Sequence, residues 1–257
     1  MQETTPRTQD SSAMNRLTSR WIAAGALFAA AGLGGCDDPH APKASSKSPS
    51  PIVRVAPGTY PDDVAFTIGG MPVHKSAIDE FVPLMKLIDP HLSEASHRRA
   101  ALANVVLPMV AGAALDPEAR EQAFQKAQRV LAAVRETGEF PEDAPEANYL
   151  TGTWKEVGLI PFKASMEMEP GTYSDLHESP AAWTFFKLIA TNVEDGETFT
   201  PRTEITIQRY DIPYLPDEAS QDLIQSAIDT LPVEIADEAW EHIIPPIVLY
   251  KPNPSQQ

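Results

Sequence analysis

The stretch WTFFKLIA, residues 183–190, is rich in aromatic and aliphatic side chains and predicts a β-strand. A Pro-Gly turn at residues 170–171 precedes it. The stretch EITIQRY, residues 204–210, has the same character and predicts a second strand, and two shorter extended runs are expected at residues 157–161 and 247–250. The second half of the chain is therefore expected to consist mainly of short strands between turns.

A hairpin and a helix are expected upstream of these strands. Residues 64–68 and 71–73 favour extended structure, and Gly69-Gly70 between them supplies the positive φ angles of a tight turn. Ser76, with Asp79 three residues later, is the expected cap of a helix that Pro83 should kink.

Two further helices are expected, one from Ser93 and one from the Asp116-Pro117 cap to near Gly138. Apolar residues recur along one face of each of these three helices, which predicts that the faces pack together. The positions expected to be fully buried are Phe81, Leu102, Val106, Val130 and Leu131. Nearer the C-terminus, a short helix is expected at residues 236–242 and a longer one at residues 217–230, burying Leu223, Ile224 and Ile228. The fold class is α+β.

Composition excludes several function classes. The 257 residues carry a net charge of -16, which repels phosphate backbones and makes nucleic acid an unsuitable partner. A single cysteine excludes an internal disulfide and a cysteine-built zinc site. The six histidines lack the spacing of paired metal ligands, and no nucleophile elbow, phosphate loop or dinucleotide fingerprint is present. We therefore expect no metal and no small-molecule cofactor.

The first 36 residues predict a signal peptide. Arg16 and Arg20 precede an apolar stretch at residues 21–33, which is too short to span a bilayer comfortably. LGGC, residues 33–36, resembles the bacterial lipobox, which implies that Cys36 becomes the mature N-terminus and is lipidated, with palmitate for example. A chance cysteine behind an ordinary signal peptide is the alternative. Residues 37–62 predict a flexible tether, so we expect a lipid-anchored protein of the bacterial cell envelope whose globular part lies in the periplasm.

One stretch of the N-terminal half resembles SurA and PpiC-type peptidyl-prolyl isomerases. FTIGGMPVHKSAID, residues 66–79, is similar to the hairpin and first helix of the SurA N-terminal region, with the helix expected at residues 98–115 behind it. The resemblance implies a helical SurA-like lobe at residues 63–116.

The second half resembles the parvulin domain of the same family. GLIP, MEPGTYSD and SPAAWTFFKLI, which begin at residues 158, 168 and 179, follow the order of that domain's closing segment. The expected helix at residues 121–137, followed by Gly-Glu-Phe, is similar to the parvulin helix before it. The resemblance implies a parvulin-like α+β lobe at residues 117–251 and a tail at residues 252–257.

The chain departs from the family at its active site. Thr184 stands where the family has its closing histidine, and no opening strand with the first histidine precedes residue 121. Residues 205–214 resemble that opening strand displaced to the C-terminal side, which would bring Asp211 and Tyr214 near the pocket; a plain strand with turn residues is the alternative. The resemblance leaves the catalytic residues unassigned and implies a peptide-binding pocket formed by Ile160, Trp183, Thr184 and Phe185.

Two functions are consistent with these features. The resemblance implies a membrane-anchored folding factor that binds unfolded or proline-containing polypeptides, and the missing histidines predict weak or no isomerase turnover. The alternative is a non-catalytic structural or interaction lipoprotein of the cell envelope. An isomerase activity, where it survives, would be of the parvulin peptidyl-prolyl cis-trans type.

Overall fold

The computed structural model describes residues 53–193, 197–216 and 220–249. The expected signal peptide, Cys36, the first part of the tether and the C-terminal tail lie outside these described residues. Within them the fold is mixed α+β, with two four-stranded sheets and helices packed against them.

The first sheet contains the expected hairpin. β2 (Val64–Ile68) pairs antiparallel with β3 (Met71–His74), and the turn residues Gly69 and Gly70 have φ angles of 58° and 82°. Two positive φ angles in succession are the property of a type I′ turn, so the prediction of a glycine hairpin is confirmed. β8 (Val233–Ile235) lies on the other side of β2, and β1 (Val53–Arg54) completes the order β1-β8-β2-β3.

Part of the range expected as tether contacts this sheet. β1 pairs in parallel with β8, and the Val55 amide donates to the Ile235 carbonyl oxygen at 3.2 Å. The Tyr60 hydroxyl donates to Glu234 Oε2 at 2.6 Å. These contacts with residues far along the chain are not visible in local composition.

The helix expected from Ser76 is divided in two. α1 (Lys75–Asp79) and α2 (Val82–Ile88) are separate helices, and Pro83 occupies the first turn of α2. A proline there loses no hydrogen bond, because first-turn amides have no partner within the helix. The predicted cap was wrong: Ser76 lies inside α1, and its hydroxyl donates to Asp63 Oδ2 at 2.7 Å.

The next two helices begin where the sequence predicts. The Ser93 hydroxyl accepts from the Ser96 amide at the start of α3 (Glu94–Ala101), and Asp116 Oδ1 accepts from the Ala119 amide at the start of α5 (Pro117–Thr137). Gly138 ends α5 with a φ angle of 76°. These predictions are confirmed because caps depend on side chains within three residues.

A π-helical turn at Leu102–Val106 joins α3 to α4 (Leu107–Leu115), and Pro108 lies in the first turn of α4. The combined stretch Glu94–Leu115 is long and apolar enough to cross a membrane by length and composition alone. A buried core helix satisfies the same criterion, and Leu102, Val105 and Val106 are buried in the core.

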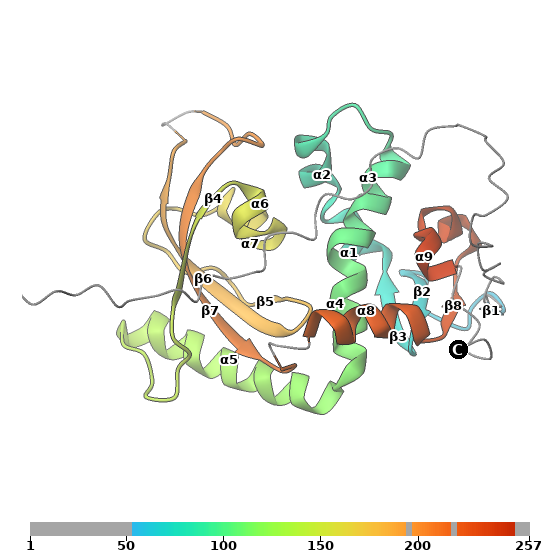
Figure 1. Cartoon of the computed structure of the whole chain (residues 1–257), viewed down its shortest axis with the longest axis horizontal. Coiled ribbons are helices and arrows are strands. Elements are labelled where there is room, and N and C mark those ends of the chain that lie inside the picture. Colours follow the sequence, from blue (N-terminus) through green and yellow to red (C-terminus); the bar gives the residue numbers. More distant parts are fainter. Residues whose placement is uncertain (1–52, 194–196, 217–219, 250–257) are drawn as a thin grey trace, which may run out of the picture. The chain divides into compact units, whose positions relative to one another are not determined.

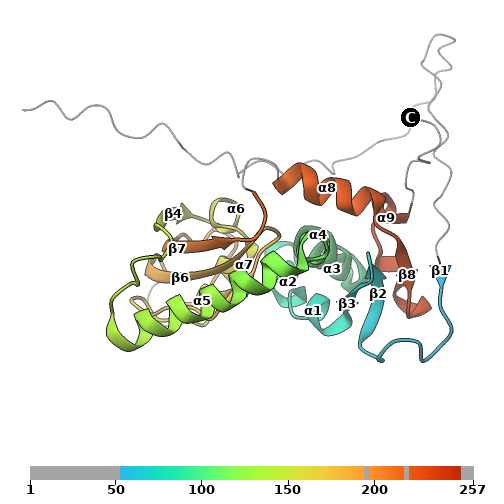
Figure 2. The same ribbon diagram turned by 90° about the horizontal axis from the view of Figure 1, so that it is seen from below.

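The second sheet is antiparallel throughout, in the order β4-β7-β6-β5. Its strands are β4 (Asn148–Gly152), β5 (His177–Glu178), β6 (Ala182–Thr191) and β7 (Ile205–Pro213), so the two main strand predictions are confirmed. α5 runs along one face of this sheet, and α6 (Trp154–Val157) and α7 (Leu159–Ser165) lie on the opposite side (Figures 1 and 2).

Two short strand predictions were wrong. The run expected at residues 157–161 belongs to α6 and α7, because Thr153 and Glu156 form a capping box and Gly158, with a φ angle of 93°, separates the two helices. The run expected at residues 247–250 lies, as far as it is described, in α9 (Pro246–Leu249). Short apolar runs do not distinguish a strand from a buried helical turn.

The C-terminal segment returns to the first sheet. α8 (Ser220–Thr230) packs against α4, and β8, the 3₁₀ helix η2 (Glu238–Ile243) and α9 follow it. We call residues 53–116 with 220–249 the first lobe, and the described part of residues 117–216 the second lobe. The sequence division placed residues 220–249 with the second half, whereas the strand pairing joins β8 to β2 of the first. The helix prediction holds for Ile224 and Ile228, but Leu223 is exposed.

All five core positions named from the helical stripes are buried, which confirms those assignments. The packing partner of α5 differs from the prediction, however. Its stripe, including Val130 and Leu131, lies mainly against β6 and β7 rather than against α3 and α4. A helix of 21 residues is about 30 Å long, so only its first turns reach the first lobe.

The two lobes meet closely at the turn between β5 and β6. A Cβ atom added to Gly112 of α4 would lie 1.8 Å from the Pro180 carbonyl oxygen. Arg120 at the start of α5 forms a bidentate ion pair with Glu178 beside the same turn. Its Nε and Nη2 atoms donate to the two carboxylate oxygens at 2.5 and 2.7 Å. Only glycine permits this approach of the α4 backbone to the turn.

Candidate functional site

The four pocket residues expected from the sequence do not come together. Trp183 and Phe185 point toward α5: the Trp183 ring lies 4.7 Å from that of Phe124, and Phe185 stacks on Tyr210 at 5.0 Å. Thr184, between them in β6, points to the other face of the sheet because side chains alternate along a strand. The fourth residue, Ile160, is half-buried in α7, on the side opposite α5.

Trp183 is occupied in holding the fold together. Its indole nitrogen donates to the Arg120 carbonyl oxygen at 3.1 Å, and the Arg120 guanidinium lies 5.3 Å from the centre of its ring. Arg120 in turn binds Glu178, so the three side chains form one connected cluster beside the β5–β6 turn. Trp183 therefore packs as a structural residue rather than as the wall of an open pocket.

A row of polar side chains crosses the opposite face of the second sheet. The strand registers place His177 of β5 opposite Thr184 of β6, and Thr184 opposite Asp211 of β7. Thr184 Oγ1 donates to Asp211 Oδ1 at 2.6 Å, and Arg209 Nε donates to the same oxygen at 2.8 Å. We call His177, Thr184, Asp211 and Arg209 the polar row; it is the candidate functional site.

The Thr184 hydroxyl has little hydrogen-bonding capacity left for a substrate. Its one hydroxyl hydrogen is directed to Asp211, so only its lone pairs remain to accept a hydrogen bond. The residue is 3% exposed, which keeps these lone pairs from solvent. Arg209 pairs with Asp211 at 2.8 Å, on the same oxygen that accepts from Thr184. The row therefore lacks an exposed donor at Thr184, and its carboxylate is already paired within the sheet.

Two residues of the row, His177 and Arg209, were not predicted from the sequence. The β5–β6 hairpin aligns His177 with Thr184, since both are equally far from the turn at residues 180–181. Its ring stacks on Phe186 with centroids 6.0 Å apart, and its buried Nε2 has no hydrogen-bond partner among the described residues. The position of that turn between residues 177 and 184 was the available signal.

The electrostatic environment of His177 keeps its imidazole neutral. Burial lowers the pKa of His177, and Lys163 of α7 lowers it further, while Asp175 and Glu80 act in the opposite direction. Lys163 also binds Glu80 of the first lobe at 2.8 Å. His177 thus lies close to an ion pair that connects the two lobes.

Asp211 and Tyr214 were the two residues expected near the pocket from the hypothesis of a displaced opening strand, and they lie in different environments. Asp211 lies beside Thr184 within hydrogen-bond distance. The Tyr214 hydroxyl instead donates to the Ser179 carbonyl oxygen at 2.8 Å, and burial raises the pKa of Tyr214. Asp211 is therefore part of the polar row, whereas Tyr214 stabilises the β5–β6 turn.

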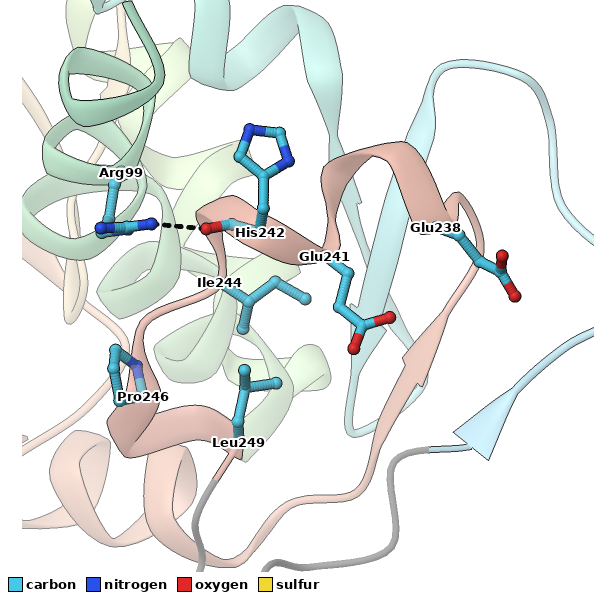
Figure 3. Close-up of a pocket in the computed structure, with 7 residues that line it drawn as sticks. All are labelled: Arg99, Glu238, Glu241, His242, Ile244, Pro246 and Leu249. Carbon is cyan, nitrogen blue, oxygen red and sulfur yellow. Dashed lines mark hydrogen bonds between the residues drawn. The ribbon is translucent and has the colours of Figure 1, made fainter. Parts of the chain in front are cut away.

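A cavity of about 490 Å³ in the first lobe is a second candidate (Figure 3). Ile244 and Leu249 point toward each other in it, while the His242 imidazole and the Glu238 carboxylate point away from them. Arg99 donates to the His242 carbonyl oxygen at 2.6 Å, and Glu241 is bound by Arg54 at 2.9 and 3.1 Å. The two charged groups beside the apolar lining, Arg99 and Glu241, are therefore already bonded, and the cavity is the weaker candidate.

Within the described ranges, no three histidine, cysteine, aspartate or glutamate side chains gather as metal ligands. Comparisons of the chain with profiles of known protein families, with curated proteins and with solved structures found no match.

Proposed function

We propose that the protein is a membrane-anchored, extracytoplasmic folding factor of the peptidyl-prolyl isomerase and chaperone type that binds unfolded polypeptides and has weak or no isomerase turnover. The observation that carries the proposal is the hydrogen bond between Thr184 and Asp211. The SurA and parvulin resemblance implied that a displaced opening strand would bring Asp211 and Tyr214 near the pocket. Of these two, Asp211 is a neighbour of the pocket residue Thr184 across β6 and β7, whereas Tyr214 is not.

Three further features support a parvulin-like second lobe. The long helix α5 covers one face of the second sheet and ends at Gly138, as in the sequence comparison with the parvulin helix. The GLIP stretch and the residues after it form α7 on the other side of the sheet. β6, which contains Thr184, lies in the middle of the sheet beside β7.

The polar row supports low turnover. Rotation of a prolyl bond faces a barrier of about 18 to 20 kcal/mol, and an enzyme lowers it with groups placed to stabilise the twisted amide. Thr184 donates its hydrogen to Asp211 and is buried, and Arg209 neutralises that aspartate. These groups stabilise each other and leave little for a substrate.

Binding of unfolded polypeptide is supported by apolar side chains that the second lobe exposes. Four large ones are between 36% and 68% exposed: Phe140, Tyr149, Met166 and Ile189. Each of them offers an apolar contact to the hydrophobic segments that an unfolded chain presents. The membrane anchor in the proposal rests on the lipobox resemblance around Cys36.

Two measurements on the full-length chain in detergent test the proposal. We expect prolyl isomerase turnover at least about 100-fold below that of an ordinary parvulin, and suppression of the aggregation of an unfolded reporter protein. Turnover equal to that of an ordinary parvulin would contradict the expectation of weak or no isomerase activity. Fatty-acid labelling that is lost in Cys36→Ser would support the anchor, and equal labelling of both forms would contradict it.

A non-catalytic structural or interaction lipoprotein is the second candidate. The mutual pairing of Thr184, Asp211 and Arg209 favours it, because such a network can serve stability alone. Absence of both turnover and binding of unfolded polypeptide would select this function.

A further inference from the structure

Four strands stand at the edges of the two sheets, and they differ in how well they are protected. β1 and β5 have two residues each, and β3 has four, including Pro72, which lacks an amide hydrogen. β4 has five residues, NYLTG, with no proline and no charge. Natural edge strands are usually short or carry prolines or charges that prevent further pairing. Among the described edges, β4 alone is both long enough to pair and unprotected.

The outer side of β4 has hydrogen-bonding groups to offer. β4 pairs with β7 on one side, and no described strand pairs with it on the other. In an antiparallel pair, alternate residues direct their amide and carbonyl groups away from the partner strand. Over five residues, about 17 Å long, this leaves a row of backbone donors and acceptors with the spacing that an added extended chain matches.

Side chains along β4 add a preference for the occupant. Tyr149 is 68% exposed, and Asn148 and Thr151 are also exposed. A residue placed opposite Tyr149 on an added strand would lie against its ring, and such cross-strand pairs favour aromatic and β-branched side chains. The edge therefore favours an extended segment with apolar residues at alternate positions.

We infer that β4 binds an extended, uncharged and apolar segment of unfolded polypeptide as an added strand of the second sheet. This inference rests on the proposed function and specifies how the client is held. A second copy of the chain is a weaker occupant, because each copy carries a net charge of -16 and like charges oppose association.

The edge is separated from Thr184 by β7, although Arg209 of the polar row is the β7 residue opposite Asn148 of β4. β7 and β6 stand between β4 and β5, and Thr184 lies on β6. Strand addition uses backbone groups of β4 and needs no contact with Thr184. Client binding and prolyl chemistry are therefore separable, and a chain without turnover keeps its binding edge.

The test is binding of a fluorescein-labelled peptide of about nine alternating valine and threonine residues to the full-length chain in detergent. We expect saturable binding, weakened at least about tenfold in Thr151→Lys, because a lysine on the edge disfavours a new strand. Gln128→Lys adds the same charge on an exposed position of α5 and should leave binding unchanged. Both variants are first checked for unchanged circular dichroism and Tm.

Hydrogen exchange locates the bound peptide. Protection of amides at residues 148–152 by the peptide would support the inference, and protection elsewhere without change in β4 would overturn it. Equal binding by Thr151→Lys and the wild type would also overturn it while leaving the proposed function intact. No binding of any unfolded polypeptide would contradict the proposed function itself, and a dimer lost in Thr151→Lys would show that a second copy covers the edge.

Discussion

The two faces of the second sheet are built from the same strands and differ in chemistry. The face toward α5 is aromatic: Phe140 stacks on Tyr210 at 4.6 Å, and Tyr210 stacks on Phe185. The face toward α7 carries the polar row beside Phe186 and Leu188, which are fully buried. Neighbouring residues of β6 serve the two faces in turn, so a motif that is continuous in sequence is divided between a packing function and a candidate site.

Packing on the aromatic face holds the polar row of the opposite face in position. Aromatic side chains fix α5 on the sheet and hold the β5–β6 turn through Trp183 and Arg120. The polar row is then positioned by strand registers that this packing maintains. Substitutions on the aromatic face should therefore affect folding most, and substitutions in the row should have smaller effects.

The largest effect is expected for Phe185→Ala. Phe185 is fully buried, and its truncation should lower the free energy of unfolding by about 3 to 5 kcal/mol through lost burial and a cavity beside Tyr210. Phe140→Ala, on the same face but 36% exposed, is the matched control and should cost far less. Urea unfolding measures both, and equal losses would mean that burial does not distinguish the two positions.

Arg120→Ala should have the next largest effect. It leaves Glu178 without its partner in a site where the two side chains are 28% and 15% exposed. A fully buried pair broken in this way costs roughly 3 to 5 kcal/mol, and solvent reduces the expected loss here to about 2 kcal/mol. The double variant Arg120→Ala with Glu178→Gln should recover part of that loss. Calorimetric unfolding measures these losses, and a double variant whose loss equals the sum of the two single losses would contradict the expectation.

Thr184→Val should have a modest effect on stability. Valine keeps the shape but removes the hydrogen bond to Asp211, and a bond to a charged group is worth about 1.5 to 3 kcal/mol. Arg209 still binds Asp211, so we expect a loss near the lower end, about 1.5 kcal/mol. Thr151→Val, which removes an exposed hydroxyl contact with Thr206, is the control. Any isomerase turnover should be unchanged in Thr184→Val, and a large drop would show that Thr184 takes part in chemistry.

The smallest effect is a pH dependence that comes from His177. Its pKa in the folded chain lies below the ordinary 6.5, so the unfolded chain binds the proton first as the pH falls. The stability that neutral His177 contributes to the folded chain is therefore complete above about pH 6.5, and it decreases as the pH drops toward the pKa of the folded state. His177→Phe should show less loss of stability than the wild type between about pH 7 and 5.

The groups around His177 set how large that loss is. Lys163 opposes protonation, while Asp175 and Glu80 favour it. The measurement is the urea midpoint of the wild type and of His177→Phe across this pH range. If the two midpoints change with pH by the same amount, the lowered pKa of His177 is contradicted.

Local features of the fold were predictable where neighbouring residues decide them. The Gly69-Gly70 turn, the Ser93 and Asp116 caps and the end of α5 at Gly138 were all expected, because each depends on interactions within a few residues. The division between α1 and α2 and the helices at residues 154–165 were not, since short apolar runs fit either type of element.

The candidate site was predictable only in part. Thr184 and the possibility of Asp211 beside it came from the sequence, and alternation along β6 alone separates Thr184 from Trp183 and Phe185. The place of His177 in the row depends on the β5–β6 register, which two residues of β5 cannot reveal locally.

Local backbone preference and the periodicity of apolar residues were enough to predict the Ser93 and Asp116 caps, the glycine hairpin, the two main strands and the buried stripes. Three other features follow from no local pattern: β8 returns to β2, α5 packs on the second sheet, and His177, Thr184 and Asp211 align. These features depend on pairing between residues distant in the chain, and a register between strands is fixed only when whole faces are buried together.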